Sequence, residues 1–390
     1  MITTLSSSAS RYSTSNNGYD GVVRISANGS VGTGVLLYDG RAVLTAAHLL
    51  EGVTSAQVSF LINGVVQRGS SSTIVVHPNA DTSMANNDVA ILWLSSAPEG
   101  AERYQLYRDT DEVGQSFRAV GYGQHGSGNT STRSDGSETH RLVVQNSFDV
   151  TGDTLKAGLG NSISWTPASG TQLLADFDNG SAANDAFGQM LGVNNQGVGI
   201  DEGLIAPGDS GGPAFIGDAV AGLASYVASI STWWANTDVD ALQNSSFGEF
   251  AAWQRVSHYQ RWIDQSIREQ YIDAPTTPDE VKLEITEGNS ATSYAFFMVS
   301  FNGDRGLASD ILSVQYTSRD GSAKAGEDYL AVSGTLNIYD DERYALIAVE
   351  VLGDTAAESD ETFYLDIFNP KGGEFPDSME TLTAMRTIMN

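Results

Sequence analysis

The sequence predicts an all-β fold in two units, and three observations support this. Residues 21–150 consist of short stretches that alternate apolar and polar side chains, separated by Gly, Asn and Asp about every dozen residues, as in antiparallel sandwiches and barrels. A second series of about seven such stretches fills residues 281–390. The 390 residues also exceed what one ordinary core requires, so more than one domain is expected.

The first unit follows a polar segment, residues 1–20, that is rich in Ser, Thr and Asn. Its predicted strands are GVVRISA, TGVLLYDGRAVLTAA, AQVSFLI, STIVVHP, DVAILWL, SFRAVGYG and RLVVQNSFDV. Residues 151–200 are rich in Gly, Asn and Asp and predict a looser region. Strands return in GPAFIGDAVAGLASYVASI.

One amphipathic helix is expected at the end of the first unit, because apolar side chains recur there at helical spacing. They are Val256, Tyr259, Ile263 and Ile267. Residues 273–280, DAPTTPDE, contain two prolines and are predicted to be a linker. The predicted domains are therefore residues 21–272 and 281–390.

Composition limits the classes of partner. The sequence has 20 Lys and Arg against 48 Asp and Glu, a net charge of −28, which argues against nucleic acid and anionic membrane surfaces and suits hard cations such as calcium. The absence of cysteine excludes disulfides, thiolate metal sites and cysteine nucleophiles.

No apolar run approaches the roughly 18 residues of a membrane span. The start of the sequence has no basic region followed by an apolar stretch, so no conventional signal peptide is predicted. Two explanations stay open for an exported protein: a leader removed before this numbering, or a route that needs none.

The hexapeptide GDSGGP places Ser210 among turn-forming residues. It forms either an ordinary turn or a loop that presents a serine hydroxyl to a substrate. A serine hydroxyl is a weak nucleophile, so the second alternative requires a nearby base and a carboxylate that orients the base.

Among the five histidines, His48 is the best candidate for that base, because an alternating strand ends there in small residues that leave room for an imidazole. The other four lie in loop, helix or structural contexts. Asp88 begins the apolar strand in NNDVAIL, and a half-buried carboxylate needs a hydrogen-bonding partner such as a histidine. The three residues occur in the order His, Asp, Ser.

The segments LTAAH, NNDVAIL and PGDSGGP together resemble the three signature blocks of the trypsin/chymotrypsin family of serine proteases, over about residues 20–268. The resemblance implies two six-stranded antiparallel β-barrels with the active site between them, followed by a helix. It also implies that Ser210 is the nucleophile, His48 the general base and then acid, and Asp88 the orienting carboxylate. The backbone amides of Gly208 and Ser210 would form the oxyanion hole.

The same resemblance implies how a substrate binds. Ser225 matches the serine that bonds the buried aspartate, and the segment Ser225, Tyr226 and Val227 would pair with the substrate backbone as an added strand. Leu204 stands where trypsin-like enzymes place the aspartate that binds Lys or Arg.

The resemblance also implies that Val227 stands at the mouth of the specificity pocket, where the family often has a glycine, and that Ala251 lines the opposite wall. A branched side chain at the mouth narrows the pocket, which favours small or medium apolar residues before the scissile bond. The alternative is a loop shift that brings Asp201 or Glu202 into the pocket and restores a preference for basic residues.

Two further features depart from known patterns. Many family members pair a freshly cleaved Ile-Val-Gly-Gly amine with the aspartate before the serine, here Asp209, but no such tetrapeptide precedes GVVRIS. Asp209 therefore has another partner, or the form is zymogen-like, or the N-terminus is engaged differently. GYGQHG, residues 121–126, matches a nucleotide-binding glycine pattern, but a polar loop follows it instead of a helix, so no nucleotide site is predicted.

The segments EG, DGSAKAGEDY and ESDE make residues 280–390 similar to the Calx-β domain, whose loops bind calcium at one end of a sandwich. The positions that match calcium ligands are Glu287, Asp328, Asp354, Glu358 and Glu361. The alternative is an acidic, solvated rim that binds no ion. The sequence stops where the family adds two further aspartates, which predicts a truncated domain and further domains of a larger polypeptide.

The predicted function is an extracellular, secreted or cell-surface serine endopeptidase that acts on proteins or peptides through an acyl-enzyme. It needs no cofactor for catalysis, and Ca2+ is expected in the Calx-β domain. Two alternatives remain: a non-enzymatic, calcium-binding adhesion protein with an inert protease-like domain, and a self-processing protease with a preference for basic residues.

Overall fold

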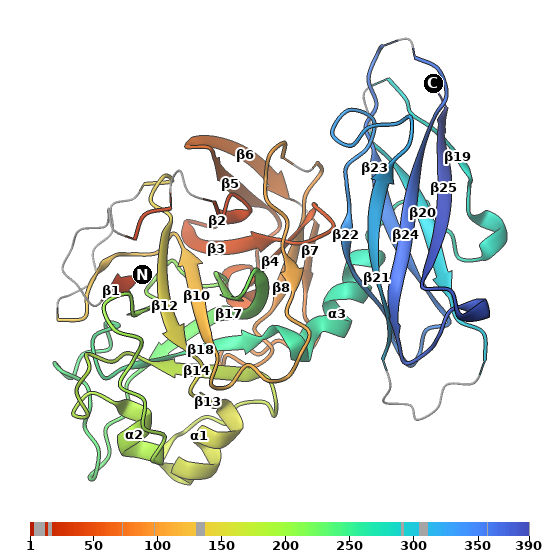
Figure 1. Ribbon diagram of the computed structural model, residues 1–390. Coiled ribbons are helices and arrows are strands. Elements are labelled where there is room, and N and C mark those ends of the chain that lie inside the picture. The colour runs from red at the N-terminus through yellow and green to blue at the C-terminus, as the bar shows by residue number, and fades with distance from the viewer. Residues whose placement is uncertain are drawn as a thin grey trace. The chain divides into compact units, whose positions relative to one another are not determined.

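The computed structural model describes residues 1–3, 12–14, 18–71, 73–96, 98–129, 137–289, 292–303, 311–356 and 358–389. Residues 4–11 and 15–17 of the polar N-terminal segment lie outside the described residues. The chain divides into two compact units, residues 1–263 and 264–390, and each is described by itself (Figure 1). The predicted domain limits, 21–272 and 281–390, stay a prediction.

The first sheet closes into a barrel. Its pieces are β2 (Val22–Ala27), β3 (Ser30–Leu36), β4 (Ala42–Thr45), β5 (Ala56–Ile62), β6 (Val65–Ser71), β7 (Thr73–Val76) and β8 (Ala90–Trp93). They are ordered β6-β5-β2-β3-β4-β8-β7. Because β6 and β7 are separated by a single residue and occupy the two edges, one length of chain joins both edges, and the seven pieces form six strands.

The second sheet closes in the same way. Its pieces are β10 (Ser116–Gly121), β12 (Leu142–Ser147), β13 (Val150–Thr151), β14 (Gln172–Asp176), β16 (Pro213–Ile216), β17 (Ala219–Ala228) and β18 (Phe250–Arg255), with the short β9 (Gln105–Leu106) added beside β17. The order runs from β12 to β13, which are separated only by Phe148 and Asp149. The predicted pair of six-stranded barrels is thus confirmed.

A small three-stranded sheet joins the chain start to the second barrel. It consists of β1 (Ile2–Thr3), β11 (Gly126–Ser127) and β15 (Gly203–Leu204). β1 runs parallel to β11 and antiparallel to β15.

The region expected to be loose, residues 151–200, contains two short helices, α1 (Gly152–Leu159) and α2 (Ala186–Leu191). Each has a side-chain cap: Thr151 Oγ1 accepts from the Thr154 amide, and the Asp185 carboxylate accepts from the Gly188 amide. The expectation of a looser region is therefore wrong for these two segments.

The predicted amphipathic helix is α3 (Val256–Arg268), which follows β18 directly. All four apolar positions that predicted it, Val256, Tyr259, Ile263 and Ile267, are at most 2% exposed. No described helix is long and apolar enough to cross a membrane.

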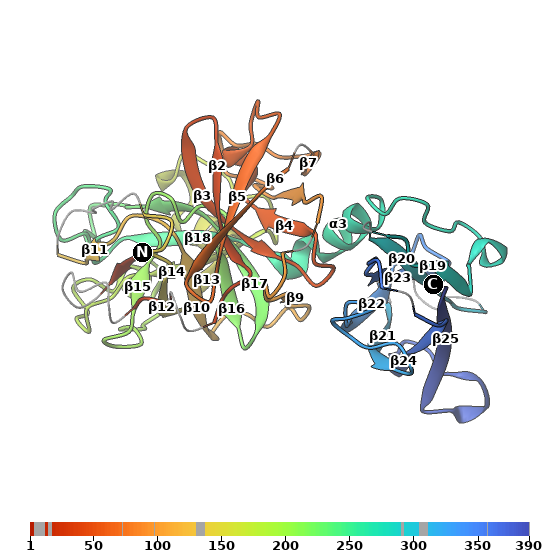
Figure 2. The same cartoon turned by 90° about the horizontal axis from the view of Figure 1, so that it is seen from above.

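The second unit is a β-sandwich of seven strands, as expected. One layer holds β19 (Glu284–Thr286), β21 (Leu312–Asp320), β22 (Ser333–Ile338), β24 (Glu361–Lys371) and β25 (Thr381–Met389), and the other holds β20 (Ser293–Ser300) and β23 (Tyr344–Val351). Figure 2 shows β20 and β23 apart from β21 and β24. The rings of Tyr329 and Phe363 stack between the layers with centroids 4.5 Å apart.

Candidate active site

His48 and Asp88 lie at the ends of neighbouring strands. β4 ends at Thr45 and β8 begins at Ala90, and these two residues are paired in register. The chain beyond β4 forms a single helical turn, Ala47–Leu49, that carries His48. The His48 amide donates to Asp88 Oδ1 at 2.8 Å, and His48 Nδ1 lies 2.7 Å from Asp88 Oδ2.

Asp88 is almost fully buried, with 1% of its surface exposed, whereas the His48 side chain is 30% exposed. Ser225 Oγ donates a third hydrogen bond to the Asp88 carboxylate, at 2.6 Å. Burial alone would raise the pKa of Asp88, but the hydrogen bonds and charge of His48, together with the bond from Ser225, outweigh it and lower the pKa. Asp88 is therefore a charged acceptor that orients the histidine ring.

Ser225 also accepts a hydrogen bond from a buried polar network that is centred on Gln254. Gln254 Nε2 donates to Ala85 O at 2.8 Å and to Ser225 Oγ at 3.3 Å. The Tyr259 hydroxyl contacts Gln254 Oε1 at 3.1 Å and Asn87 Oδ1 at 3.2 Å. Sequence reasoning missed this network, because it treated Tyr259 as an apolar helix position. The glutamine that ends the otherwise apolar run AAWQ could have indicated a buried polar contact at this position.

The loop that carries Ser210 is anchored to the first barrel. The Thr33 amide donates to Ser210 O at 2.8 Å, and Thr33 Oγ1 donates to Gly208 O at 2.9 Å. Gly211 has φ of 78°, and a Cβ there would lie 2.1 Å from Thr45 Oγ1 and 2.7 Å from the Ala46 nitrogen. The Ser210 loop thus packs against the segment that leads into His48.

Of the three predicted catalytic residues, His48 and Asp88 touch, and Ser210 lies on the adjoining loop. Ser210 is half-buried. No hydrogen bond joins the Ser210 hydroxyl to the His48 ring in the described part of the chain. Catalytic hydrogen bonds of this kind often tighten only when substrate binds.

The peptide between Pro207 and Gly208 is held in one orientation. The Gln124 amide donates to Pro207 O at 2.8 Å. Because the C=O and N–H of a trans peptide point in opposite directions, the Gly208 N–H points away from Gln124. Gly208 has φ of 95°, and a Cβ there would lie only 2.9 Å from Gly123 Cα. The Gly208 and Ser210 amides donate to no described residue, which leaves both for a ligand oxygen.

Asp209 is fully buried, and its carboxylate accepts three hydrogen bonds. It accepts from the amino group of Met1 at 2.7 Å, from the Gly123 amide at 2.7 Å and from the Ala206 amide at 2.9 Å. Met1 is itself 1% exposed and is placed by the pairing of β1 with β15. Of the alternatives open for Asp209, the structure therefore shows an N-terminal amine as its partner.

The residues predicted to line the specificity pocket share one apolar cluster. Leu204 and Ala251 are fully buried, and the half-buried Val227 packs against the same cluster. Val227 pairs directly with Ala251 between β17 and β18. The Glu202 carboxylate accepts from the amides of Asp178 at 2.7 Å and Val198 at 2.6 Å, so its oxygens are already engaged.

The C-terminal end of β17 is paired with a neighbouring strand along one edge only, among the described residues. Tyr226, Val227 and Ala228 pair with β18, whereas the pairing of β17 with β16 extends only as far as Leu223. The Tyr226 hydroxyl donates to Gln172 Oε1 at 2.9 Å. The Gln243 side-chain amide donates to Val227 O.

The five predicted calcium-ligand positions of the second unit come together. One carboxylate oxygen each of Asp328, Glu358 and Glu361 lies within 4.8 Å of the others. The Asp354 amide donates to Glu287 Oε1 at 3.1 Å. Burial and then the neighbouring Asp328 raise the pKa of Glu361, and the Glu287 charge adds to this effect. A set of oxygens with mutual repulsion fits a hard cation.

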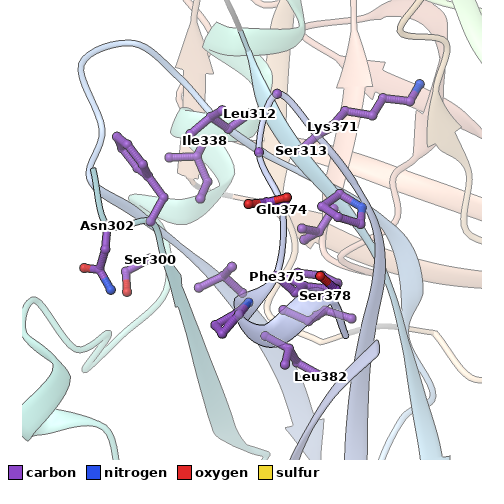
Figure 3. Close-up of a pocket in the computed structure, with 18 of the residues that line it drawn as sticks. Ser300, Asn302, Leu312, Ser313, Ile338, Lys371, Glu374, Phe375, Ser378 and Leu382 are labelled. Carbon is purple, nitrogen blue, oxygen red and sulfur yellow. The ribbon is translucent and has the colours of Figure 1, made fainter. Parts of the chain in front are cut away.

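A cleft of about 690 Å³ opens at the other end of this sandwich (Figure 3). β24 runs from Glu361 at the acidic cluster to Lys371 at the cleft. Apolar side chains such as Leu312 and Leu382 line it, and Glu374 lies at its centre in Figure 3. Sequence reasoning did not predict this cleft.

Comparison with known proteins gives two family matches. The family described as Trypsin matches residues 9–204, half of the chain, and the match ends six residues before Ser210. The Calx-beta domain matches residues 280–390. The sodium/calcium exchanger Calx of Drosophila melanogaster is 39% identical over 72 residues, which cover 18% of this chain and 7% of the exchanger.

Proposed function

Because this chain belongs to the trypsin family and continues into a Calx-beta domain, we propose that it is a serine endopeptidase. The observation that carries the proposal is the buried, charged Asp88 bonded to His48 Nδ1, next to a loop whose Gly208 and Ser210 amides are free. A merely structural histidine would need neither the buried acceptor nor the open amides.

In the proposed mechanism, Ser210 Oγ attacks the carbonyl carbon of the scissile bond while His48 Nε2 takes the hydroxyl proton. Asp88 holds the proton on Nδ1, so Nε2 is the free acceptor. The Gly208 and Ser210 amides stabilise the negative oxygen that forms, and the loss of one such donor costs about 3 kcal/mol. The C–N bond then breaks as His48 protonates the leaving amine, and water releases the acyl group by the same steps.

We propose that the substrate is an extended segment of a protein outside the cell or at its surface. The open side of Tyr226 and Val227 supports strand addition by the substrate backbone. The apolar surroundings of Leu204, Val227 and Ala251 favour a small or medium apolar residue before the scissile bond. The engagement of Glu202 by two amides argues against a basic preference that is provided by Glu202.

The acidic cluster of the second unit is proposed to bind Ca2+ through oxygens of Asp328, Glu358 and Glu361, with Glu287 and Asp354 beside them. The ion would supply positive charge that links the loops at one end of the sandwich. It has no part in the hydrolysis.

A fluorophosphonate probe tests the proposed nucleophile. We expect the full chain to be labelled at Ser210 and the Ser210→Ala variant to stay unlabelled. A correctly folded chain with no labelling, judged by its melting curve, would instead support the inert adhesion protein.

A peptide library tests the proposed specificity. Cleavage after small or medium apolar residues is expected. Cleavage after Lys or Arg would contradict the assignment of Leu204, Val227 and Ala251, and would support the alternative based on Asp201 or Glu202.

A further inference from the structure

The protease unit contains a group of buried carboxylates that the proposed mechanism does not use. Its members are Asp149 before β13, Asp176 at the end of β14, Asp178, Asp185 at the start of α2, and Glu202 before β15. Each is at most 8% exposed, and the last four are at most 2% exposed. Carboxylates are almost never buried to this degree without a partner of opposite charge.

Three of these side chains converge on one point. One carboxylate oxygen each of Asp176, Asp178 and Asp185 lies within 4.8 Å of the other two. Two oxygens bound to one calcium ion at about 2.4 Å can be at most about 4.8 Å apart, so the three oxygens fit around a single ion.

Asp178 supplies an independent sign of a missing ligand. The residue is 2% exposed, and its Oδ1 atom has no hydrogen-bond partner. The charges that act on it come from Glu202, Asp185 and Asp149, so the side chain faces the cluster.

Further hydrogen bonds hold Asp176, Asp185 and the neighbouring Asp149 in place. Asp176 Oδ2 accepts from the Phe187 amide at 2.8 Å, and Asp185 Oδ1 accepts from the Gly188 amide at 2.6 Å. Asp149 accepts from Asn195 Nδ2 at 2.7 Å. These contacts come from neutral groups and bring no positive charge.

The surrounding sequence cannot supply that charge. Residues 157–254 contain ten Asp or Glu and no Lys, Arg or His. Within the described ranges, no Lys, Arg or His forms an ion pair with Asp149, Asp176, Asp178 or Asp185. A like-charged group without a counter-ion must either take up protons or bind a cation.

We propose that Asp176, Asp178 and Asp185 bind a calcium ion in the protease unit, distinct from the acidic cluster of the Calx-beta domain. Ligands that are all oxygen, and mostly carboxylate, favour a hard cation over zinc. A cluster with at least three buried charges suits Ca2+ better than Mg2+, which binds fewer carboxylates and keeps several waters.

The ion would tie together segments that support the proposed specificity pocket. Asp176 ends β14 and pairs with Phe250, the neighbour of Ala251. The Asp178 amide donates to Glu202, two residues before Leu204. Calcium at this point would therefore stiffen the loops that lead to Leu204.

The test uses the full chain with the Calx-beta cluster disabled by Asp328→Asn and Glu361→Gln. After chelation and dialysis, we expect calorimetric titration with CaCl2 to show one site in this background. We also expect the melting temperature of the protease unit to rise by about 5–10 °C at a 100-fold excess over Kd.

Adding Asp178→Asn should abolish both the calorimetric site and the rise in melting temperature. In chelator, the same substitution should leave the melting temperature equal or higher, because it removes a buried group that lacks a partner. This second measurement separates a lost ligand from a failure to fold. The matched control is Asp218→Asn, whose aspartate is 98% exposed in the same unit and should change neither result.

Three outcomes would overturn the proposal. They are an unchanged calcium site in the Asp178→Asn variant, no calcium site in the background that retains Asp178, and an equal rise in melting temperature with MgCl2. None of these readouts depends on proteolytic activity, so they stand apart from the test of Ser210.

Discussion

Replacing Asp209 by Asn tests whether the buried amine–carboxylate pair orders the Ser210 loop. The carboxylate is fully buried and accepts bonds of 2.7 to 2.9 Å from the Met1 amine and from the amides of Gly123 and Ala206. Removing one partner of a buried pair leaves the other charge without compensation and costs about 3–5 kcal/mol. For a unit of this size, that corresponds to a melting temperature lower by about 6–20 °C.

The assay compares the melting temperature with the rate of fluorophosphonate labelling at Ser210. Asp209 adjoins both proposed oxyanion donors, Gly208 and Ser210, so part of the lost free energy should appear as disorder of that loop. We expect labelling to slow by about 10²–10³-fold, the effect of losing one oxyanion donor. Asp218→Asn, at an exposed position, is the control.

A melting temperature within about 2 °C of the parent, with labelling within twofold, would refute the reasoning. A lower melting temperature with unchanged labelling would show that the pair stabilises the barrel without ordering the loop. In that case the geometry of the Gly208 and Ser210 amides must depend on the Gln124–Pro207 contact instead.

Three further predictions concern other sites. Burial raises the pKa of Asp39 to about 6, although hydrogen bonds from the Ala42 and Arg41 amides oppose the shift. The protonated form is therefore favoured in the folded state, and the free energy of unfolding should fall by about 2 kcal/mol as pH rises from 4 to 7. Urea titrations of Asp39→Asn should lack this fall, and an equal fall in the variant would contradict the assignment. Gln243→Ala removes the side-chain amide that donates to Val227 O, so this carbonyl becomes available to accept a bond from the substrate backbone. We expect KM for peptide substrates to fall about 2- to 10-fold with little change in kcat. An unchanged KM would show that the substrate does not use this carbonyl. Val227→Gly removes a branched side chain beside Ala251 and should shift library cleavage toward larger apolar residues by about 10-fold, whereas an unchanged profile would place the pocket elsewhere.

The parts of the fold that sequence could predict depend on local rules. Alternation along the strands predicted an all-β chain in two units, and helical spacing predicted α3. The pair of six-stranded barrels was implied by the resemblance to the trypsin/chymotrypsin family. His48 and Asp88 could each be predicted as candidates from the strands that they adjoin, whereas their pairing was implied by the family resemblance and appears in the register of β4 and β8. The helices α1 and α2 were missed because they are only 8 and 6 residues long in a Gly- and Asn-rich region.

The parts that sequence could not predict depend on long-range contacts. The Met1 amine meets Asp209 across 208 positions, and Gln254 meets Ala85 across 169. The buried carboxylates lie at strand and helix ends and on loops between residues 149 and 202, and their positions follow no regular period, so nothing in their spacing marks them as neighbours. A sequence feature that bears on them is the lack of any Lys, Arg or His between positions 157 and 254.

The seam of each barrel has a consequence for how the protein tolerates nicks in its backbone. A single cut between β12 and β13 would convert the closed barrel into an open sheet with two unpaired edge strands. Unpaired edge strands can pair with other chains and lead to aggregation. Phe148 and Asp149, which form that joint, are buried at 0% and 8% exposure, so a second protease molecule cannot reach it. Residues 229–248 connect β17 and β18, and Trp233 in this segment is 91% exposed. We expect proteases to cut this segment before the β12–β13 junction, and such a cut should lower solubility less because it exposes no barrel edge.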